Sequence, residues 1–257
     1  MGDFDGKVAL VTGGASGLGR ETCKLFAKEG AKVIVADINR EKGQETVDMI
    51  KAAGGEATFV YTDVSISADI QNMVKAAVDK YGALNCAVNN VHFDVGMFPV
   101  AEIPEEAWEK SLRINLTGQF LGVKYEIQQM LKQGGGTIVC VGSGNSGNVG
   151  TQGRADYIAA KAAVYGMVRT AALDYGNKGI RVNAVGPGVM WTPWNADIPE
   201  VAKEWMRTLS PMDRGADPKE VAEAILWLCS DKSSFVIGHL LIADGGSTIG
   251  TPRYPGT

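Results

Sequence analysis

The sequence predicts an α/β fold: a doubly wound parallel sheet of about seven strands with helices on both faces. Three observations support this prediction. Short apolar runs rich in β-branched residues recur without polar alternation, which is typical of strands buried on both faces. Helical patterns separate these runs, and a glycine-rich turn follows the first of them. The length of 257 residues, of which 45% are hydrophobic, suits one well-filled core.

The N-terminal part of the chain predicts a βαβαβ unit. Residues 7–12 (KVALVT) form the first expected strand, and a helix begins near Arg20. The second strand, KVIVAD, ends at Asp37, and after a polar helix the third strand, ATFVYTD, ends at Asp63. Another helix reaches about Tyr81. This alternation is the pattern of a parallel sheet with crossover helices.

Four more strands are expected after this unit. They cover residues 84–89, 136–141, 180–185 and 239–243. The chain has no tandem repeat and no linker-like segment before its tail, so we expect residues 1–257 to form a single domain. Residues 187–214, rich in Pro, Trp and Met, break the alternation. We interpret them as a substrate loop or lid, with a peripheral helical excursion packed on the core as an equally supported alternative.

Charge and cysteine usage exclude several functional classes. The formal net charge is -4, and Lys and Arg are scattered along the chain, so we expect neither a nucleic-acid nor an anionic-membrane partner. No apolar stretch approaches the roughly 20 residues of a membrane-spanning helix, and we expect a cytoplasmic protein. The four cysteines form no CxxC pair, which predicts buried free thiols and no metal site. A small-molecule partner is therefore favoured.

The glycine-rich turn after the first strand predicts a pyrophosphate site. Glycines at a strand-to-helix turn let the backbone approach a phosphate, and the helix N-terminus offers free N–H groups and a partial positive charge. The residues of this turn that we expect to contact a dinucleotide are Gly13, Ser16, Gly17, Leu18 and Gly19.

Asp37 indicates which dinucleotide binds. A carboxylate at the end of the second strand can accept hydrogen bonds from the adenosine ribose hydroxyls, whereas the 2′-phosphate of NADP would meet a like charge. Neither Ser16 nor Ile38 supplies a cation for that phosphate. The sequence therefore predicts NAD as the cofactor, with Arg20 and Arg40 as the two residues that could oppose this choice.

Asp63 has two interpretations. Its side chain can contact the adenine edge, with apolar contact from Val64, or it can simply cap the following helix.

Tyr157 and Lys161 are the candidate proton-transfer pair. Four residues apart on a predicted helix, they share one face. The ordinary pKa of a tyrosine is about 10. A lysine cation within about 4 to 6 Å lowers that pKa by roughly 1 to 3 units, and an oxidised nicotinamide adds a second positive charge. Ser143 follows the strand ending at Val141, at the sheet edge where ligands bind, and can donate a hydrogen bond to the substrate oxygen.

Further motifs occur in an ordered series: Asn89-Asn90, Asn115 in RINLTG, Pro187-Gly188, Thr192 and Asp244-Gly245-Gly246. Together with the glycine turn, Asp37 and the Tyr157 helix, this series resembles the single-domain, NAD-preferring short-chain dehydrogenases/reductases over nearly the whole chain. The resemblance implies a Rossmann-like, dinucleotide-binding and catalytic domain. It implies hydride transfer between nicotinamide and a secondary alcohol or ketone, without a metal.

The resemblance also implies residue roles. The catalytic tetrad is expected to be Asn115, Ser143, Tyr157 and Lys161. Lys161 would also bind the nicotinamide ribose, Asn115 would order a relay water, and Thr192 would contact the carboxamide. Besides the glycine turn, Asp37, Lys161 and Thr192, the expected cofactor contacts are Ile38, Asp63, Val64, Asn89, Tyr157, Pro187, Gly188 and Val189.

One position departs from the family pattern. The family usually has Asn-Asn-Ala-Gly after the fourth strand, whereas this chain reads Asn89-Asn90-Val91-His92. His92 is therefore a candidate substrate contact, or a second proton donor with a pKa in the useful range. A structural or solvent-facing histidine is the alternative.

The substrate prediction depends on residues 187–214. If they close over the site, an apolar wall forms from Val149, Met190, Trp191, Trp194, Trp205 and Met206, which favours a hydrophobic cyclic or aromatic alcohol over a polyol. The expected substrate contacts are His92, Ser143, Asn145, Val149, Tyr157, Trp191 and Trp194.

Two alternatives stay open, one within this chemistry and one outside it. A cis-dihydrodiol or hydroxysteroid dehydrogenase would use the same site. A non-catalytic dinucleotide-binding regulatory protein is the remote alternative, which the complete tetrad disfavours. The resemblance further implies a homotetramer assembled through the helices at residues 105–131 and 155–175.

Overall fold

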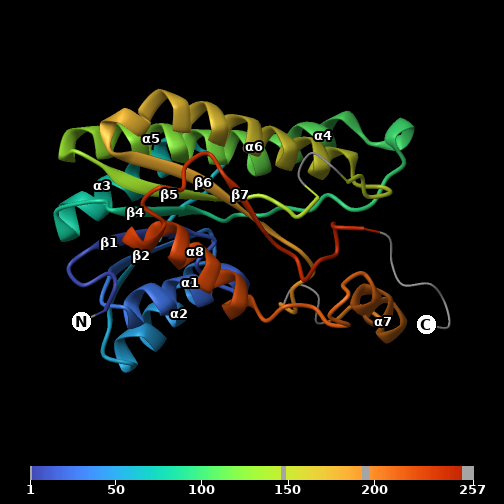
Figure 1. The fold of residues 1–257 in the computed structure, drawn as a ribbon, viewed down its shortest axis with the longest axis horizontal. Coiled ribbons are helices and arrows are strands. Elements are labelled where there is room, and N and C mark those ends of the chain that lie inside the picture. Colours follow the sequence, from blue (N-terminus) through green and yellow to red (C-terminus); the bar gives the residue numbers. More distant parts are fainter. Residues whose placement is uncertain (1, 146–148, 193–196, 251–257) are drawn as a thin grey trace.

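The fold is a seven-stranded parallel sheet between two layers of helices (Figure 1). The computed structural model describes residues 2–145, 149–192 and 197–250. The strand order is β3-β2-β1-β4-β5-β6-β7, and every strand pair is parallel. The chain builds the sheet from β1 to β3 in one direction and, after β3, crosses back to place β4 on the other side of β1. The strands are β1 (Val8–Thr12), β2 (Lys32–Asp37), β3 (Glu56–Tyr61), β4 (Cys86–Asn89), β5 (Gly136–Val141), β6 (Ile180–Pro187) and β7 (Leu240–Ala243). The predicted fold class and the predicted count of about seven strands are confirmed.

Three strand ends differ from the sequence prediction. β3 ends at Tyr61 rather than Asp63, because the register with β2 stops where Asp37 pairs with Tyr61. β6 extends past Val185 to Pro187, since β7 pairs with it as far as Pro187 and Ala243. β4 begins only at Cys86. In each case the strand is defined by its neighbour, which the apolar run alone does not reveal.

Each face of the sheet has its own core. Helices α1 (Gly17–Lys28), α2 (Arg40–Ala52) and α8 (Pro218–Cys229) cover one face, and α3 (Ser67–Tyr81), α5 (Gly118–Gln133) and α6 (Ala155–Tyr175) cover the other. Alternate residues of β2 serve the two cores, with Val33 and Val35 packing on the α1 side and Ile34 on the α3 side. The strands are therefore apolar on both faces, which explains the lack of polar alternation in the sequence.

The expected helix at residues 105–131 is interrupted. Its two parts, α4 (Glu105–Leu112) and α5, are joined by a π-helical turn, Arg113–Thr117. Such turns widen a helix locally and occur often at functional sites. Asn115 lies in this turn.

Residues 187–214 contain a short helix, α7 (Glu200–Thr208), none of whose residues is buried. Figure 1 shows α7 standing apart from both helical layers. Met190 and Met206, before and within this helix, line the main cavity. The helix is therefore not packed into the core, while the closing movement expected of a lid stays a prediction.

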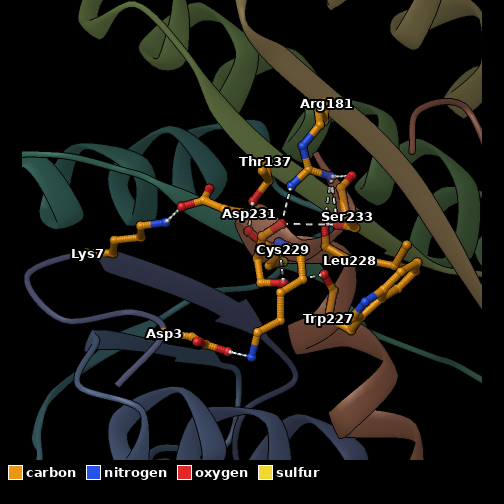
Figure 2. A network of polar contacts seen from close by, with 11 residues as sticks. Asp3, Lys7, Thr137, Arg181, Trp227, Leu228, Cys229, Asp231 and Ser233 are labelled. Atoms are coloured by element: carbon orange, nitrogen blue, oxygen red, sulfur yellow. Dashed lines mark hydrogen bonds and ion pairs between the residues drawn. The ribbon is translucent and has the colours of Figure 1, made fainter. Parts of the chain in front are cut away.

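A polar network ties the end of α8 to the sheet (Figure 2). Arg181 on β6 donates from Nη1 to the carbonyl oxygens of Leu228 (2.9 Å) and Ser233 (3.1 Å), and from Nη2 to that of Ser230 (2.9 Å). The last carbonyls of a helix have no partner within the helix, so Arg181 supplies donors that α8 lacks. Because Arg181 lies near the amino end of β6, this network is remote from the carboxyl edge of the sheet.

Two composition-based expectations can be compared with the structure. The four cysteines, Cys23, Cys86, Cys140 and Cys229, are all free and buried, as predicted. Among the described residues, no helix has the length and apolar character needed to cross a membrane.

Candidate active site

The main cavity, of about 860 Å³, brings together most of the residues that the sequence singled out. It runs along the carboxyl edge of the sheet, from the glycine turn to the segment after β6. The predicted residues that line it are Gly13, Ser16, Gly17, Leu18, Asp37, Ile38, Asp63, Val64, His92, Tyr157, Lys161, Pro187, Gly188, Val189 and Thr192.

The glycine turn forms a cradle that no larger residue would fit. A Cβ at Gly19 would lie 2.0 Å from the Gly13 carbonyl oxygen, and Gly13 and Gly17 have φ values of 68° and 49°. α1 begins at Gly17, and its N-cap Ser16 makes no side-chain capping bond. The first-turn amides of α1 therefore face the cavity without a side-chain cap, an arrangement suited to an anionic ligand group.

Asp37 is held rigidly beside this cradle. Its Oδ2 accepts a hydrogen bond from the Ala15 amide (3.0 Å), and its Oδ1 accepts one from the Asn39 amide (2.8 Å). The carboxylate is thus fixed at the cavity wall between the glycine turn and the end of β2.

The two arginines that could oppose NAD have other partners. Arg20 donates to the Ala15 carbonyl oxygen (2.6 Å) and to Thr46 Oγ1 (3.0 Å), and it forms an ion pair with Glu45 (3.0 Å). The Arg40 guanidinium lies 4.1 Å from the centroid of the Tyr61 ring.

Asp63 and Val64 line the same cavity, just after the end of β3, the strand that pairs with β2 beside Asp37. Asp63 Oδ1 accepts from the Ser65 amide (2.8 Å), which shapes the turn before α3, while the N-cap of α3 is Ile66. Asp63 therefore does not cap the helix itself.

Asn115 organises the loop after β4. Its Oδ1 accepts from the Phe93 amide, and its Nδ2 donates to the Phe93 carbonyl oxygen, both at 2.8 Å. Nδ2 also contacts Ser111 Oγ (3.1 Å), and the His92 side chain is hydrogen-bonded to Asn115. The Asn115 side chain is fully buried, and from the π-helical turn it points toward the loop after β4. In this structure Asn115 therefore contacts the site by its hydrogen bonds to His92 and Phe93.

Tyr157 and Ser143 meet at the carboxyl edge of the sheet, where their hydroxyls are hydrogen-bonded. Burial raises the pKa of Tyr157, and the hydrogen bond with Ser143 and the Arg154 charge oppose this rise only in part. The sequence prediction of a lowered Tyr157 pKa is therefore wrong for the protein without cofactor, because desolvation outweighs the neighbouring charges.

Lys161 shares a helical face with Tyr157, but its amine points to the sheet. Nζ donates to the Val141 carbonyl oxygen (2.8 Å) and lies 5.8 Å from the centroid of the Tyr157 ring. Lys161 is 1% exposed, and burial lowers the pKa of Lys161 to about 8. A substantial neutral fraction of Lys161 therefore exists at slightly alkaline pH.

His92 packs edge-on against Tyr157. The two ring centroids are 5.1 Å apart, and the rings are inclined at 77°. Burial, with the positive charge of Lys161, lowers the pKa of His92 to about 4. The imidazole is therefore neutral at physiological pH, and the expected pKa in the useful range is not found.

One ion pair at the site has no signal in the sequence. Arg154 Nη1 contacts Asp94 Oδ2, and these two side chains are 14% and 15% exposed. The guanidinium also lies 5.2 Å from the centroid of the Tyr157 ring. The pair ties the loop after β4 to the start of α6, over a separation of 60 residues that no local pattern spans.

Several predicted contacts lie elsewhere. The Asn89 amide donates to Glu126 Oε2 (2.8 Å) in the core. The Asn145 amide donates to Thr151 Oγ1 (2.9 Å). The Trp191 ring packs on Gly215, where a Cβ would approach it to 2.8 Å, and Val149 is 37% exposed. None of these four lines the cavity in this structure, and their ligand contacts stay predictions.

Trp194 lies outside the described residues. Instead, the cavity is lined by further residues that the sequence did not single out, namely Phe93, Lys110, Arg113 and Ile114. All four come from the loop after β4 and from α4 with its π-helical turn, elements whose approach to the site depends on the tertiary fold.

Comparison with known proteins agrees with this geometry. The family model described as enoyl-(acyl carrier protein) reductase matches residues 13–248. A 2,5-dichloro-2,5-cyclohexadiene-1,4-diol dehydrogenase of Sphingobium indicum is 41% identical, with 96% of this chain and 99% of the relative aligned. A cyclohexanol dehydrogenase of an Acinetobacter species is 39% identical, with 95% and 96% aligned.

A solved structure is similar over the same extent. The crystal structure of levodione reductase superposes with a TM-score of 0.92 at 31% identity, covering 96% of this chain and all of that chain. With the dinucleotide cradle, the Ser143–Tyr157 pair and Lys161 at one sheet edge, these matches establish that the chain belongs to the short-chain dehydrogenase/reductase family.

Proposed function

We propose that this protein is an NAD(H)-dependent oxidoreductase that interconverts a secondary alcohol and a ketone, with a hydrophobic cyclic or aromatic substrate. The observation that carries this proposal is the single cavity lined by both the glycine cradle and the Tyr157–Lys161 pair. A cofactor bound along this cavity would extend from the glycine cradle to Tyr157. Its reactive ring would then lie beside the residues that we propose for proton transfer.

The residues present fit NAD. The cradle at Gly13 and Gly17 suits a pyrophosphate, and the fixed Asp37 carboxylate suits the two hydroxyls of an unphosphorylated ribose. Arg20 is engaged by Glu45 and Thr46, so it offers little to a 2′-phosphate. Thr192, Pro187 and Val189 line the other end of the cavity, where the carboxamide would lie by family resemblance.

The chemistry follows from the residues around Tyr157. When bound, the nicotinamide accepts or gives the hydride. Tyr157 takes the hydroxyl proton in oxidation and returns it in reduction, while Ser143 holds the substrate oxygen. Burial raises the pKa of Tyr157, and the positive charge of an oxidised nicotinamide held beside it would lower that pKa. Asn115 and Lys161 complete the tetrad by resemblance.

A cyclic substrate is supported by the cavity lining and by the relatives. Val91, Phe93, Ile114, Met190 and Met206 supply an apolar wall, which favours a ring over a polyol. The dehydrogenases named above act on a chlorinated cyclohexadienediol and on cyclohexanol, and the structural neighbour is a levodione reductase. A cis-dihydrodiol or hydroxysteroid substrate stays an alternative within the same chemistry.

The assembly and location are carried over from the family resemblance. We propose a homotetramer formed through α5 and α6, which lie side by side in Figure 1 and expose Phe120, Leu131 and Leu173. A cytoplasmic location stays a prediction.

The test is turnover by the purified protein with a panel of alcohols, followed by the absorbance of the reduced cofactor. We expect kcat/KM for cyclohexanol and cyclic diols with NAD to exceed that for sorbitol-like polyols, and NADP to be used poorly. Preferential turnover of polyols would contradict the substrate class. Equal use of NADP would contradict the cofactor assignment.

A further inference from the structure

Two side-chain oxygens on α5 are buried and have no hydrogen-bond partner within the described chain, namely Gln119 Oε1 and Glu126 Oε1. Gln119 is 3% exposed, and Glu126 is fully buried. A buried polar atom without a partner is costly, and ordered water commonly satisfies such atoms. Seven residues apart, the two side chains lie on one face of α5, about 10 Å apart along the helix axis.

Both residues belong to a buried polar cluster between α5 and the sheet. Asn89 on β4 donates from Nδ2 to Glu126 Oε2 (2.8 Å). Gly122, between the two α5 residues, leaves the room that the Asn89 side chain needs, since a Cβ there would lie 2.2 Å from Asn89 Oδ1. Cys140 is the partner of Asn89 in the β4–β5 register. The cluster consists of Asn89, Gln119, Glu126, Cys140 and Lys161.

The cluster reaches the catalytic lysine through one carbonyl group. Gln119 Nε2 donates to the Val141 oxygen (3.1 Å), which also accepts from Lys161 Nζ (2.8 Å). Two donors thus share one acceptor behind the active site. The orientation of the Gln119 amide therefore influences how strongly this carbonyl holds Lys161.

Glu126 is a neutral acid in this setting. Burial raises the pKa of Glu126 to about 8, so the carboxyl group is protonated at neutral pH. Because Oε2 accepts from Asn89, the proton belongs on Oε1, where it needs an acceptor. Cys140 on β5 belongs to the same buried region, where desolvation raises the pKa of its thiol and keeps the thiol neutral, and α3 faces the same core with apolar side chains.

We propose that ordered internal water lies between Glu126 Oε1 and Gln119 Oε1, and that these two side chains are positioning residues for Lys161. Water beside Glu126 accepts the Glu126 proton in a hydrogen bond, and the same molecule or one hydrogen-bonded to it donates to Gln119 Oε1. The amide is then fixed with Nε2 toward the Val141 carbonyl, and this shared acceptor sets the position of the Lys161 amine. No proton is transferred along this chain of hydrogen bonds.

The role of Lys161 rests on the proposed function, and substitutions test it by the pH profile of kcat. Glu126→Met removes the donor, and we expect kcat to fall about tenfold, which corresponds to about 1.4 kcal/mol, with a shifted alkaline limb. Glu126→Gln keeps a neutral donor and an acceptor for Asn89, so it should retain the wild-type kcat and pH profile up to about pH 8, above which only the wild type loses the donor proton.

Gln133→Met is the matched control on the same helix. The Gln133 side chain bonds the Leu84 backbone, away from the cluster, so this variant should lose stability without a change in the pH profile. A wild-type pH profile and kcat in Glu126→Met would overturn the positioning role. Impairment of Glu126→Gln to the level of Glu126→Met would overturn the requirement for a neutral donor.

The water site itself is tested without turnover and without any variant. A crystal structure of the wild-type protein that resolves ordered water should contain water within about 3.2 Å of Glu126 Oε1, connected to Gln119 Oε1. Direct contact of the two side chains, or a dry gap between them, would overturn the proposal. If the water is present but no alcohol is turned over, the proposed function fails and the water site does not.

Discussion

Asp37 shows how backbone contacts prepare a single side chain for recognition. Two backbone amides hold its carboxylate at the cavity wall before any ligand binds. A preformed acceptor of this kind loses little freedom on binding, so we expect it to add affinity for ribose hydroxyls and to repel a phosphate in the same place.

Replacement of Asp37 by Ala should raise the KM for NAD by roughly 10- to 100-fold and narrow the preference for NAD over NADP, because a charged acceptor is lost. Steady-state kinetics with both cofactors measure this effect. Asp63→Ala is the matched comparison, since Asp63 is a second carboxylate in the same cavity, which we expect at the adenine, and its loss should affect both cofactors alike. An unchanged cofactor ratio in Asp37→Ala would show that another group reads the ribose.

His92 occupies the position at which the family usually has a glycine. Its imidazole ring is neutral and packs against the Tyr157 ring. His92→Gly should raise the KM for a cyclic substrate several-fold by enlarging the cavity, and His92→Phe should restore much of that packing. Because burial keeps the pKa of His92 near 4, neither variant should remove a limb from the pH profile of kcat between pH 6 and 8. Loss of such a limb, measured by initial rates across this range, would show that His92 titrates during turnover.

At the scale of elements, helix ends and helix interruptions position the site. α1 begins at the glycine turn, the π-helical turn aims Asn115, and the Arg181 network anchors the far end of α8 (Figure 2). The Arg181 network thus lies at the amino edge of the sheet, whereas the main cavity lies at its carboxyl edge.

Arg181→Met should lower the free energy of unfolding by about 2 to 4 kcal/mol, because several backbone carbonyls lose their donor at once. Chemical denaturation measures this loss. Lys7→Met removes an ion pair with the exposed Asp231 and a cation–π contact with Phe4, so it should cost only about 1 kcal/mol. Equal losses in the two variants would mean that Arg181 does not anchor α8.

The buried carboxyl group of Glu126 makes the free energy of unfolding depend on pH. The folded protein keeps the Glu126 proton up to a pKa of about 8, whereas the unfolded chain releases it near its ordinary value of 4.5. Glu126 therefore lowers the free energy of unfolding as the pH rises from 4.5 to about 8. Glu126→Gln should be more stable than the wild type by about 2 to 4 kcal/mol at pH 7, with little difference at pH 4, in denaturation curves at both pH values. A difference that is independent of pH would contradict the raised pKa.

At the scale of the whole molecule, the sequence predicts the sheet well, and most of the residues that it singles out for the cofactor and the chemistry line one cavity, while their roles stay predictions. Strands buried on both faces produce apolar runs, and motifs such as the glycine turn or Tyr157 and Lys161 are local in the chain. The Arg154–Asp94 pair and the Lys161 contact with the Val141 carbonyl depend on tertiary approach. The burial of a side chain also depends on the tertiary fold. For this reason the directions in which the pKa values of Tyr157 and His92 shift differ from the sequence prediction.

The central claim is that Tyr157 carries the proton in an NAD-linked alcohol oxidation. Its most direct test is kcat for a cyclic alcohol with Tyr157→Phe, together with the Kd for NAD, because Phe keeps the ring packing against His92 and removes only the hydroxyl. We predict that kcat falls by at least about 100-fold while the Kd for NAD stays within about twofold of the wild type. Near-normal turnover by Tyr157→Phe would contradict the account.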